Sequence, residues 1–220
     1  MPRPTIVMVS GAAPGLGKTS LSRRIADALR IEDRCVELFE EADILEREEF
    51  AEVMRSFRST GSAPADLLLD AARRYAATAR RSDEQLVVQD MLFPYLPSLL
   101  AWGHDDGDIE AFFAALLAVC DGIDLLQLHL VGDPTRSLAR AVRREDPPWL
   151  EWMLAKVATY ADADGPVTDF DSLVRYFEAA TDRTSRLLAA APWPVVVLDA
   201  DHGEAAVVEE ALRALALRLT

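Results

Sequence analysis

A glycine-rich segment between an apolar run and an amphipathic run constrains the fold of this 220-residue chain more than any other feature. Residues 5–9, Thr-Ile-Val-Met-Val, are typical of a buried strand, and Leu21, Ile25 and Leu29 recur at helical spacing after the glycines. Between them, residues 10–20 read Ser-Gly-Ala-Ala-Pro-Gly-Leu-Gly-Lys-Thr-Ser. A strand, a glycine loop and a helix in this order predict a phosphate-binding loop. Ala12 replaces the first glycine of the usual pattern, with Gly11 one position earlier.

The chemistry of phosphate binding explains the residue types in this loop. Gly15 and Gly17 let the backbone turn so that successive N–H groups point at a phosphate, and the following helix adds its unpaired N-terminal N–H groups. Lys18 would place a cation on the β- and γ-phosphate oxygens, and the Thr19 hydroxyl would be a ligand for Mg²⁺. The predicted nucleotide-binding residues of the loop are Ala13, Pro14, Gly15, Leu16, Gly17, Lys18, Thr19 and Ser20.

Strand-like and helix-like segments alternate along the whole chain. The predicted strands are 5–10, 35–39, 85–90, 125–131 and 194–199. The predicted helices are about 18–30, 42–58, 65–81, 92–102, 108–120, 134–144, 149–161, 169–190 and 204–219. This alternation predicts one α/β domain over residues 1–220, with a doubly wound, mainly parallel five-stranded sheet flanked by helices.

The charge balance excludes several classes of protein. The chain has 23 basic and 37 acidic residues and a net charge of −14, which argues against nucleic-acid binding and against docking to anionic lipid. The longest apolar runs, such as residues 111–120, are far shorter than the roughly 20 residues of a membrane span. The N-terminus has no cleavage-site pattern and there are two cysteines, so we expect a cytoplasmic protein without disulfides. The sequence is compatible with a homodimer.

Two acids lie at the carboxyl ends of predicted strands, where ligands bind in parallel sheets. Asp90 ends the strand 85–90, after Leu-Val-Val-Gln, and is placed to contact Mg²⁺, the alternative being a cap of the next turn. Glu40 follows the strand 35–39 and is a candidate to orient a phosphate acceptor. Glu41 and Asp43 are rivals for that role, and the whole acidic run is also typical of a solvated helix start.

Four arginines after the fourth predicted strand share one helix face. Asp133 and Pro134 form a good helix start. The arginines that follow at positions i, i+4, i+7 and i+8 are Arg136, Arg140, Arg143 and Arg144. In so acidic a chain we expect them to bind an anion such as a triphosphate, chiefly through Arg140 and Arg143. The alternative is a solvated face that pairs with nearby acids.

This layout resembles the P-loop nucleoside and nucleotide kinases, including the thymidylate-kinase-like and deoxynucleoside-kinase-like enzymes. The resemblance rests on residues 12–19, Glu40, Asp90, the arginines of 136–144 and Leu-Asp-Ala-Asp at 198–201. It implies a P-loop NTPase fold with acceptor-side helices at about 41–83 and a helical lid at about 134–165. It also implies ATP and Mg²⁺ as cofactors, with Asp201 near the adenine. The catalytic set would be Lys18, Glu40, Asp90 and Arg140, with Mg²⁺ held at Thr19 and Asp90.

The acceptor is less defined than the nucleotide. The arginine that these kinases carry beside the acid of the third strand is missing from Gln89-Asp90-Met91, and residues 41–83 contain no Asn or Gln to read a nucleobase. We therefore predict ATP-dependent transfer to a hydroxyl of a small molecule, which could be a nucleoside, a nucleotide, a sugar-like metabolite or an antibiotic. Arg58 and Trp149 are candidate acceptor contacts, although a tryptophan at helical spacing is more often a core residue.

Two other functional classes remain as alternatives. The first is a P-loop ATPase or switch protein, and the second is a nucleotide-binding protein without turnover. The complete absence of asparagine argues against a GTPase, which reads guanine with an Asn-Lys-x-Asp motif. The segment Asp162-Ala163-Asp164-Gly165 imitates the Asp-x-x-Gly of GTPases but does not follow the third strand, so we assign it no role.

Overall fold

The computed structural model describes residues 3–31, 34–82 and 86–218. A five-stranded, all-parallel sheet runs through the centre, with the strand order β2-β3-β1-β4-β5. The strands are β1 (Thr5–Ser10), β2 (Val36–Phe39), β3 (Leu86–Asp90), β4 (Asp124–Val131) and β5 (Val195–Asp199). Because β1 lies between β3 and β4, the chain leaves it toward β2 and β3 on one side and later returns to β4 and β5 on the other.

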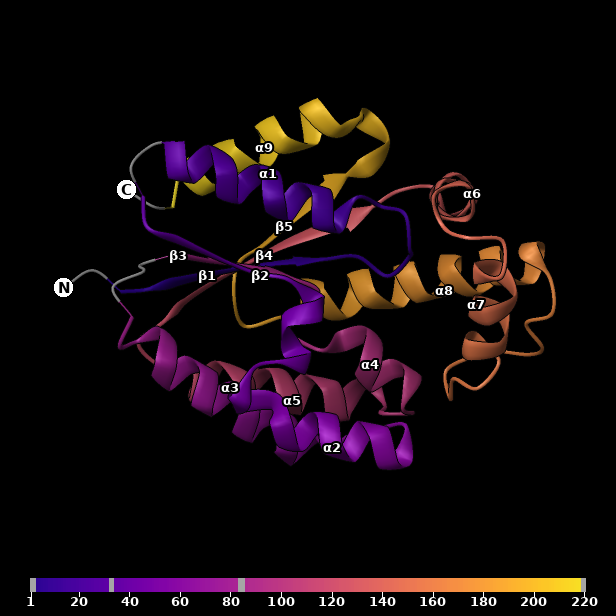
Figure 1. The fold of residues 1–220 in the computed structure, drawn as a ribbon, viewed down its shortest axis with the longest axis horizontal. Coiled ribbons are helices and arrows are strands. Elements are labelled where there is room, and N and C mark those ends of the chain that lie inside the picture. Colours follow the sequence, from indigo (N-terminus) through magenta and orange to yellow (C-terminus); the bar gives the residue numbers. More distant parts are fainter. Residues whose placement is uncertain (1–2, 32–33, 83–85, 219–220) are drawn as a thin grey trace.

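Helices connect and cover the strands. The α-helices are α1 (Lys18–Ile31), α2 (Ala51–Thr60), α3 (Ala65–Ala79), α4 (Leu96–Ala101), α5 (Asp106–Val119), α6 (Pro134–Arg144), α7 (Trp149–Val157), α8 (Phe170–Ala189) and α9 (Glu204–Ala216). Short 3-10 turns are η1 (Glu41–Leu45), η2 (Glu48–Phe50) and η3 (Ala200–His202). Figure 1 shows α1 and α9 on one face of the sheet and α3 and α5 on the other.

The apolar side chains of β1 explain this three-layer arrangement. Successive residues of a strand point to opposite faces, so Ile6 and Met8 pack toward one helical layer while Val7 and Val9 pack toward the other. All four are completely buried, as expected for the central strand of a parallel sheet covered on both faces.

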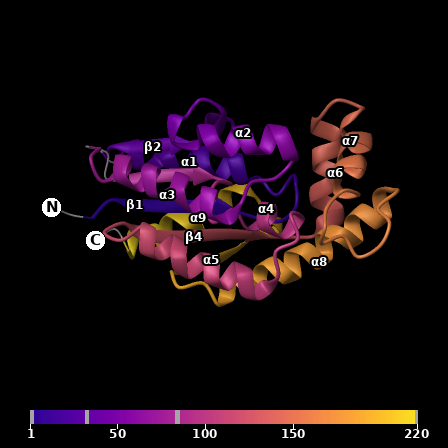
Figure 2. The same ribbon diagram turned by 90° about the horizontal axis from the view of Figure 1, so that it is seen from below.

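The carboxyl ends of the strands face a separate group of helices. Figures 1 and 2 show α6 and α7 beyond that end of the sheet, with α8 running from them back beneath it. Ligands of open parallel sheets bind in the crevice outside the carboxyl ends of the strands. The connection between β4 and β5 therefore builds a wall next to the expected ligand site.

The structure confirms the α/β class and the five strands, and it corrects several helices. The sheet is entirely parallel, not mainly so. The helix expected over 42–58 is divided into η1, η2 and α2, and the helix expected from 92 begins at Leu96. Met91 and Tyr95 adopt left-handed backbone conformations, with φ of 63° and 61°, which a right-handed helix cannot contain. The first residue of the strand expected at 85–90 and the last of the helix expected at 204–219 lie outside the described residues.

Candidate functional site: the glycine loop and the cavities beside it

The glycine loop lies between β1, which ends at Ser10, and α1, which begins at Lys18. Gly15 and Gly17 have φ values of 76° and 89°, in the region that favours glycine. At Gly15 there is a second constraint, because an added Cβ would lie 2.0 Å from the backbone oxygen of Ser137 on α6. Only glycine therefore allows the loop to approach α6 this closely.

Lys18 lies over the loop among charged neighbours. Its ammonium group donates a hydrogen bond to the Ala13 carbonyl, with 2.7 Å between Nζ and O. Burial lowers the pKa of Lys18 to about 8, an effect that the negative charges of Asp90 and Glu41 oppose and that Arg144 reinforces. With that pKa, Lys18 is mostly protonated at pH 7 and can bind the oxygens of a phosphate.

Thr19 and Asp90 form a hydrogen-bonded pair at the start of α1. The Thr19 hydroxyl donates to Asp90 Oδ2 at 2.6 Å. Asp90 is 3% exposed, and its Oδ1 has no hydrogen-bond partner among the described residues. Burial raises the pKa of Asp90, while the bond from Thr19 and the charge of Lys18 oppose the rise. A buried carboxylate oxygen without a partner, next to a hydroxyl, is a donor set that fits Mg²⁺ held mainly by waters and phosphates.

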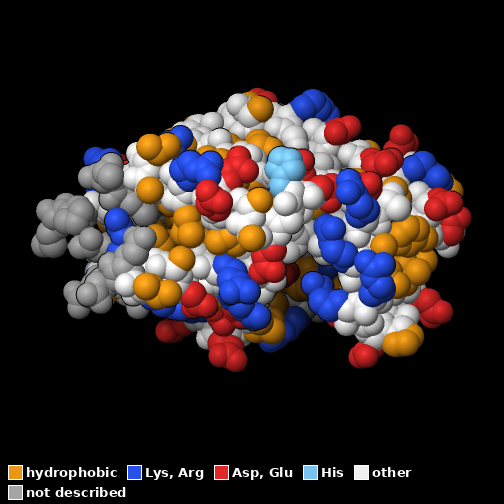
Figure 3. Space-filling model, turned by 90° about the horizontal axis from the view of Figure 1, so that it is seen from above, with side chains coloured by type: hydrophobic (Ala, Val, Ile, Leu, Met, Phe, Trp, Pro, Cys, Tyr) orange, Lys and Arg blue, Asp and Glu red, His pale blue; other side chains and the backbone are white. Residues whose placement is uncertain are grey.

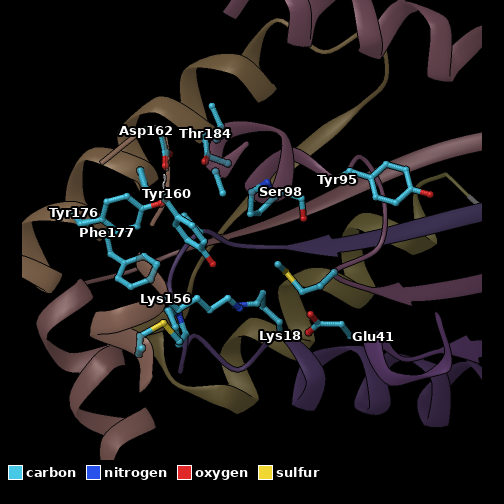
Figure 4. Close-up of a pocket in the computed structure, with 18 of the residues that line it drawn as sticks. Lys18, Glu41, Tyr95, Ser98, Lys156, Tyr160, Asp162, Tyr176, Phe177 and Thr184 are labelled. Atoms are coloured by element: carbon cyan, nitrogen blue, oxygen red, sulfur yellow. Dashed lines mark hydrogen bonds between the residues drawn. The ribbon is translucent and has the colours of Figure 1, made fainter. Parts of the chain in front are cut away.

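A cavity of about 690 Å³ opens on one side of the loop. Lys18 and Glu41 lie toward one side of it and Tyr160, Tyr176 and Phe177 toward the other (Figure 4). Other parts of its wall come from the segment after β3, from α4 and α7, and from the C-terminal ends of α2 and α6. The volume is in the range of small-molecule sites, which is about 300–1,000 Å³.

A second cavity of about 410 Å³ lies on the α9 side of the loop. Leu130, Ala200, Val207 and Val208 give it an apolar wall, and Arg140 lies at its edge. Both cavities are lined by Gly15, Gly17, Ser20 and Arg144. The two cavities therefore lie on either side of the glycine loop, and residues of the loop line both of them.

Of the first two acids after β2, the structure places Glu41 and not Glu40 in the wall of the large cavity. Glu40 receives a bidentate ion pair from Arg23 of α1, which lowers the pKa of Glu40, and it does not line the large cavity. Glu41 does line it, and its charge acts on Lys18. The two acids differ by one position at the point where β2 turns into η1, and that turn decides which of them faces the cavity.

The arginine face of α6 is only partly as expected. Figure 3 shows basic side chains gathered at the α6 end of the molecule. Arg136 is paired with Asp133 at 3.2 Å and with Asp201 at 3.1 Å, and Arg144 is paired with Glu145, so these two arginines show the pairing with nearby acids that the alternative describes. Arg143 is exposed, and no ion pair or side-chain hydrogen bond joins its guanidinium group to another residue in the part of the chain that the structure describes.

Arg140 and Asp201 together join α6 to the glycine loop. Arg140 Nε donates to the Gly15 carbonyl at 3.1 Å, and its NH1 lies 3.9 Å from Asp201 Oδ1. Asp201 Oδ2 also accepts a hydrogen bond from the Asp133 backbone N–H at 2.8 Å. Asp201 therefore holds α6 in place through Oδ2, while its buried Oδ1 has no hydrogen-bond partner among the described residues.

Of the other residues predicted to contact a ligand, some line a cavity and others are buried in the protein interior. Pro14 lines the large cavity, Leu16 lines the second, and Ala13 is buried with its carbonyl bound to Lys18. Arg58 lies in a separate hollow beside Arg55, although its neighbour Phe57 lines the large cavity. Trp149, at the start of α7, packs against a hydrophobic cluster that includes Met153 and Val157 and does not line that cavity, so its expected acceptor contact is not supported.

Sequence reasoning missed most of the wall opposite the loop. The missed lining residues are Met91, Ser98, Trp102, Tyr160, Asp162, Tyr176, Phe177 and Thr184. Part of this wall carries a sequence signal, because Phe177, Ala180 and Thr184 recur at helical spacing on α8. Asp162 lies in the irregular segment between α7 and α8, where no periodicity indicates which side chains turn inward.

The chain matches no protein-family model, and no curated protein is significantly similar to it. Within the described residues, none of the helices combines the length and the apolar character needed to cross a lipid bilayer. Assignment of a function therefore depends on the geometry of the two cavities and the loop.

Replacement of Gly15 tests the contact between the loop and α6. Gly15→Ala and Gly61→Ala both force a left-handed conformation on alanine, which costs about 1–2 kcal/mol. Nothing lies within 4 Å of a Cβ at Gly61, whereas at Gly15 the Ser137 backbone obstructs it. We expect Gly15→Ala to lower the free energy of unfolding, measured in urea, by clearly more than Gly61→Ala. Equal losses would contradict the close approach of the loop to α6.

Replacement of Asp90 should separate stability from metal binding. Because the pKa of Asp90 is raised in the folded state, its ionised form opposes folding above that pKa. We expect Asp90→Asn to leave the ligand-free melting temperature at pH 7 unchanged or higher and to weaken Mg²⁺-dependent nucleotide binding. Calorimetry with and without Mg²⁺ measures both. A lower melting temperature together with an unchanged Mg²⁺ titration would contradict the role of Asp90.

Proposed function

We propose that this protein is an ATP-dependent phosphotransferase that moves the γ-phosphoryl group of ATP to a hydroxyl of a small molecule. The observation that carries this proposal is the pair of cavities that meet at the glycine loop, beside Lys18 and the bonded Thr19 and Asp90. A transferase needs two substrates in contact at one point, and a loop with a hollow on each side provides that arrangement. The resemblance to P-loop nucleoside and nucleotide kinases supports the same assignment.

The second cavity suits the nucleoside part of ATP. Its apolar wall on β4, η3 and α9 can cover a purine, and the arginines at its edge can interact with phosphates. The loop then offers its backbone N–H groups and the N-terminus of α1 to the triphosphate. Arg140 keeps the loop attached to α6, so we assign it a positioning role in addition to any contact with phosphate.

Thr19 and Asp90 are the residues that would hold Mg²⁺. The metal would neutralise charge on the β- and γ-phosphate oxygens when bound. Lys18 adds a second positive charge at the same place and binds the same oxygens. The loop, Lys18 and the Thr19–Asp90 pair thus stabilise the charge that develops during transfer.

Glu41 is the residue that we assign to the acceptor hydroxyl. It lines the large cavity close enough to Lys18 for its charge to act on the lysine. In the reaction, a bond forms between the acceptor oxygen and the γ-phosphorus, and the bond from that phosphorus to the β–γ bridging oxygen breaks. Glu41 accepts the hydroxyl proton, and ADP leaves with the bridging oxygen.

The formation of ADP from ATP, with and without a panel of hydroxyl compounds, tests this function. We expect ADP to form when an acceptor is present, and Lys18→Ala to lower the rate about 10²–10³-fold, because it removes a preorganised charge from the transfer site. ADP formation that needs no acceptor would indicate an ATPase or switch protein. Nucleotide binding without ADP formation under any condition would indicate a binding protein.

The neighbouring glutamates provide a matched test of the acceptor-side acid. Glu41→Gln should lower kcat and leave the affinity for ATP alone unchanged, because Glu41 acts on the acceptor. Glu40→Gln should affect kcat less, because Glu40 pairs with Arg23 outside the cavity. Steady-state kinetics and ATP titrations of both variants measure this difference. If Glu41→Gln leaves kcat unchanged and Glu40→Gln lowers it strongly, the acceptor-side acid is Glu40 and not Glu41.

A further inference from the structure

The wall of the large cavity opposite the loop contains a carboxylate whose side-chain hydrogen-bond partner, among the described residues, is a tyrosine and not a cation. Asp162 lies between α7 and α8, is half-buried and lines the cavity. The Tyr176 hydroxyl donates to its two oxygens, at 3.2 Å and 3.4 Å. Burial raises the pKa of Asp162, and the bond from Tyr176 and the charge of Arg183 only partly oppose this. A cationic ligand next to Asp162 would therefore stabilise the ionised form of this carboxyl group.

The cations around Asp162 are engaged elsewhere. Arg183 donates to Asp106 Oδ1 at 2.8 Å and to the His104 carbonyl at 3.3 Å. Lys156 also lines the cavity, but its ammonium group lies 4.8 Å from the centre of the Trp152 ring, and Figure 4 shows it well apart from Asp162. Among the described residues, no ion pair joins Asp162 to a cation.

Aromatic rings surround the same part of the cavity. The ring centres of Tyr160 and Tyr176 are 6.1 Å apart, and those of Tyr176 and Phe177 are 5.0 Å apart. All three residues line the cavity. Burial and the charge of Asp162 raise the pKa of both tyrosines, that of Tyr160 to about 12, so both phenols are neutral at physiological pH. The π faces of such rings attract cations.

Thr184 adds an unsatisfied polar atom to this wall. Its side chain is 2% exposed and lines the cavity, and its hydroxyl has no hydrogen-bond partner in the part of the chain that the structure describes. A buried hydroxyl without a partner is costly, unless a ligand supplies the missing bond. Thr184 lies about two helical turns after Phe177 on the same face of α8, and both residues line the cavity.

We propose that the acceptor carries a protonated amine as well as its hydroxyl, and that Asp162 binds this amine among Tyr160, Tyr176 and Phe177. The inference rests on the proposed function, since it identifies the class of acceptor for the same site. A carboxylate supplies a charge-assisted hydrogen bond, and the rings supply cation–π attraction in a partly desolvated place. Amino sugars, aminocyclitols and aromatic amino alcohols have the required pair of groups.

Pairs of compounds in which N-acetylation removes the charge of the nitrogen test this proposal. The probes are D-glucosamine with N-acetyl-D-glucosamine, 2-deoxystreptamine with its di-N-acetylated form, and tyramine with N-acetyltyramine. Binding is measured by NMR titration in the presence of a non-hydrolysable ATP analogue and Mg²⁺, and transfer is measured by ADP formation. We expect the free amine of at least one pair to bind more tightly than its acetylated partner, by about 10–100-fold for a hydrogen-bonded charge.

Two variants complete the experiment. Asp162→Asn can still accept a hydrogen bond from Tyr176 but carries no charge, so it should abolish the difference between the two members of a pair. Asp164→Asn removes an exposed carboxylate two residues away and serves as the matched control, which should keep that difference. Thermal melting of both variants checks that they fold.

The outcomes separate this inference from the proposed function. The proposed amine site is wrong if acetylated compounds bind as well as free amines, if Asp162→Asn keeps the preference for amines, or if no probe binds. In any of these cases, Lys18-dependent ADP formation with other acceptors would still support the phosphotransferase. If amines bind in an Asp162-dependent manner but no compound is ever phosphorylated, the amine site stands and the transferase assignment fails.

Discussion

The position of β1 in the sheet is the constraint on which the candidate site depends. β1 pairs with β3 on one side and with β4 on the other, so its carboxyl end lies where the path of the chain over the sheet changes direction. The loop after β1 must pass through the crevice at this point, and parallel sheets bind ligands there. Asp90 lies opposite Val9 of β1 in the sheet register, which brings the only acid of β3 to the start of α1.

Two connections hold the loop in this crevice. Thr19 bonds to Asp90 on the β3 side, and Arg140 bonds to the Gly15 carbonyl on the α6 side. Asp201 in turn holds Arg136 and the Asp133 backbone, which ties α6 to the segment after β5. These bonds join segments far apart in the sequence around a short stretch of backbone. The region that the resemblance assigns to a helical lid is therefore anchored to the loop at its first helix.

The sequence predicted the features that depend on local pattern. The strands, the glycine loop and most helices follow from apolar periodicity and from residue types such as glycine and proline, which act over a few positions. The arrangement of the site residues depends also on contacts between residues far apart in the sequence. Whether Glu40 or Glu41 faces the cavity depends on where β2 ends, and one residue reverses the direction of a side chain. The pairing of Arg136 with Asp201, 65 positions away, and the inward turn of Asp162 depend on tertiary packing that no local pattern encodes.

A structure of the protein with Mg²⁺ and a non-hydrolysable ATP analogue tests the central claim, that the loop separates a nucleotide cavity from an acceptor cavity. We expect the triphosphate on residues 12–19, the metal at Thr19 and Asp90, and the purine against Val207 and Val208, with the large cavity left open beside Glu41. A purine bound in the large cavity among Tyr160, Tyr176 and Phe177 would contradict this arrangement, because no space for an acceptor would remain next to the γ-phosphate.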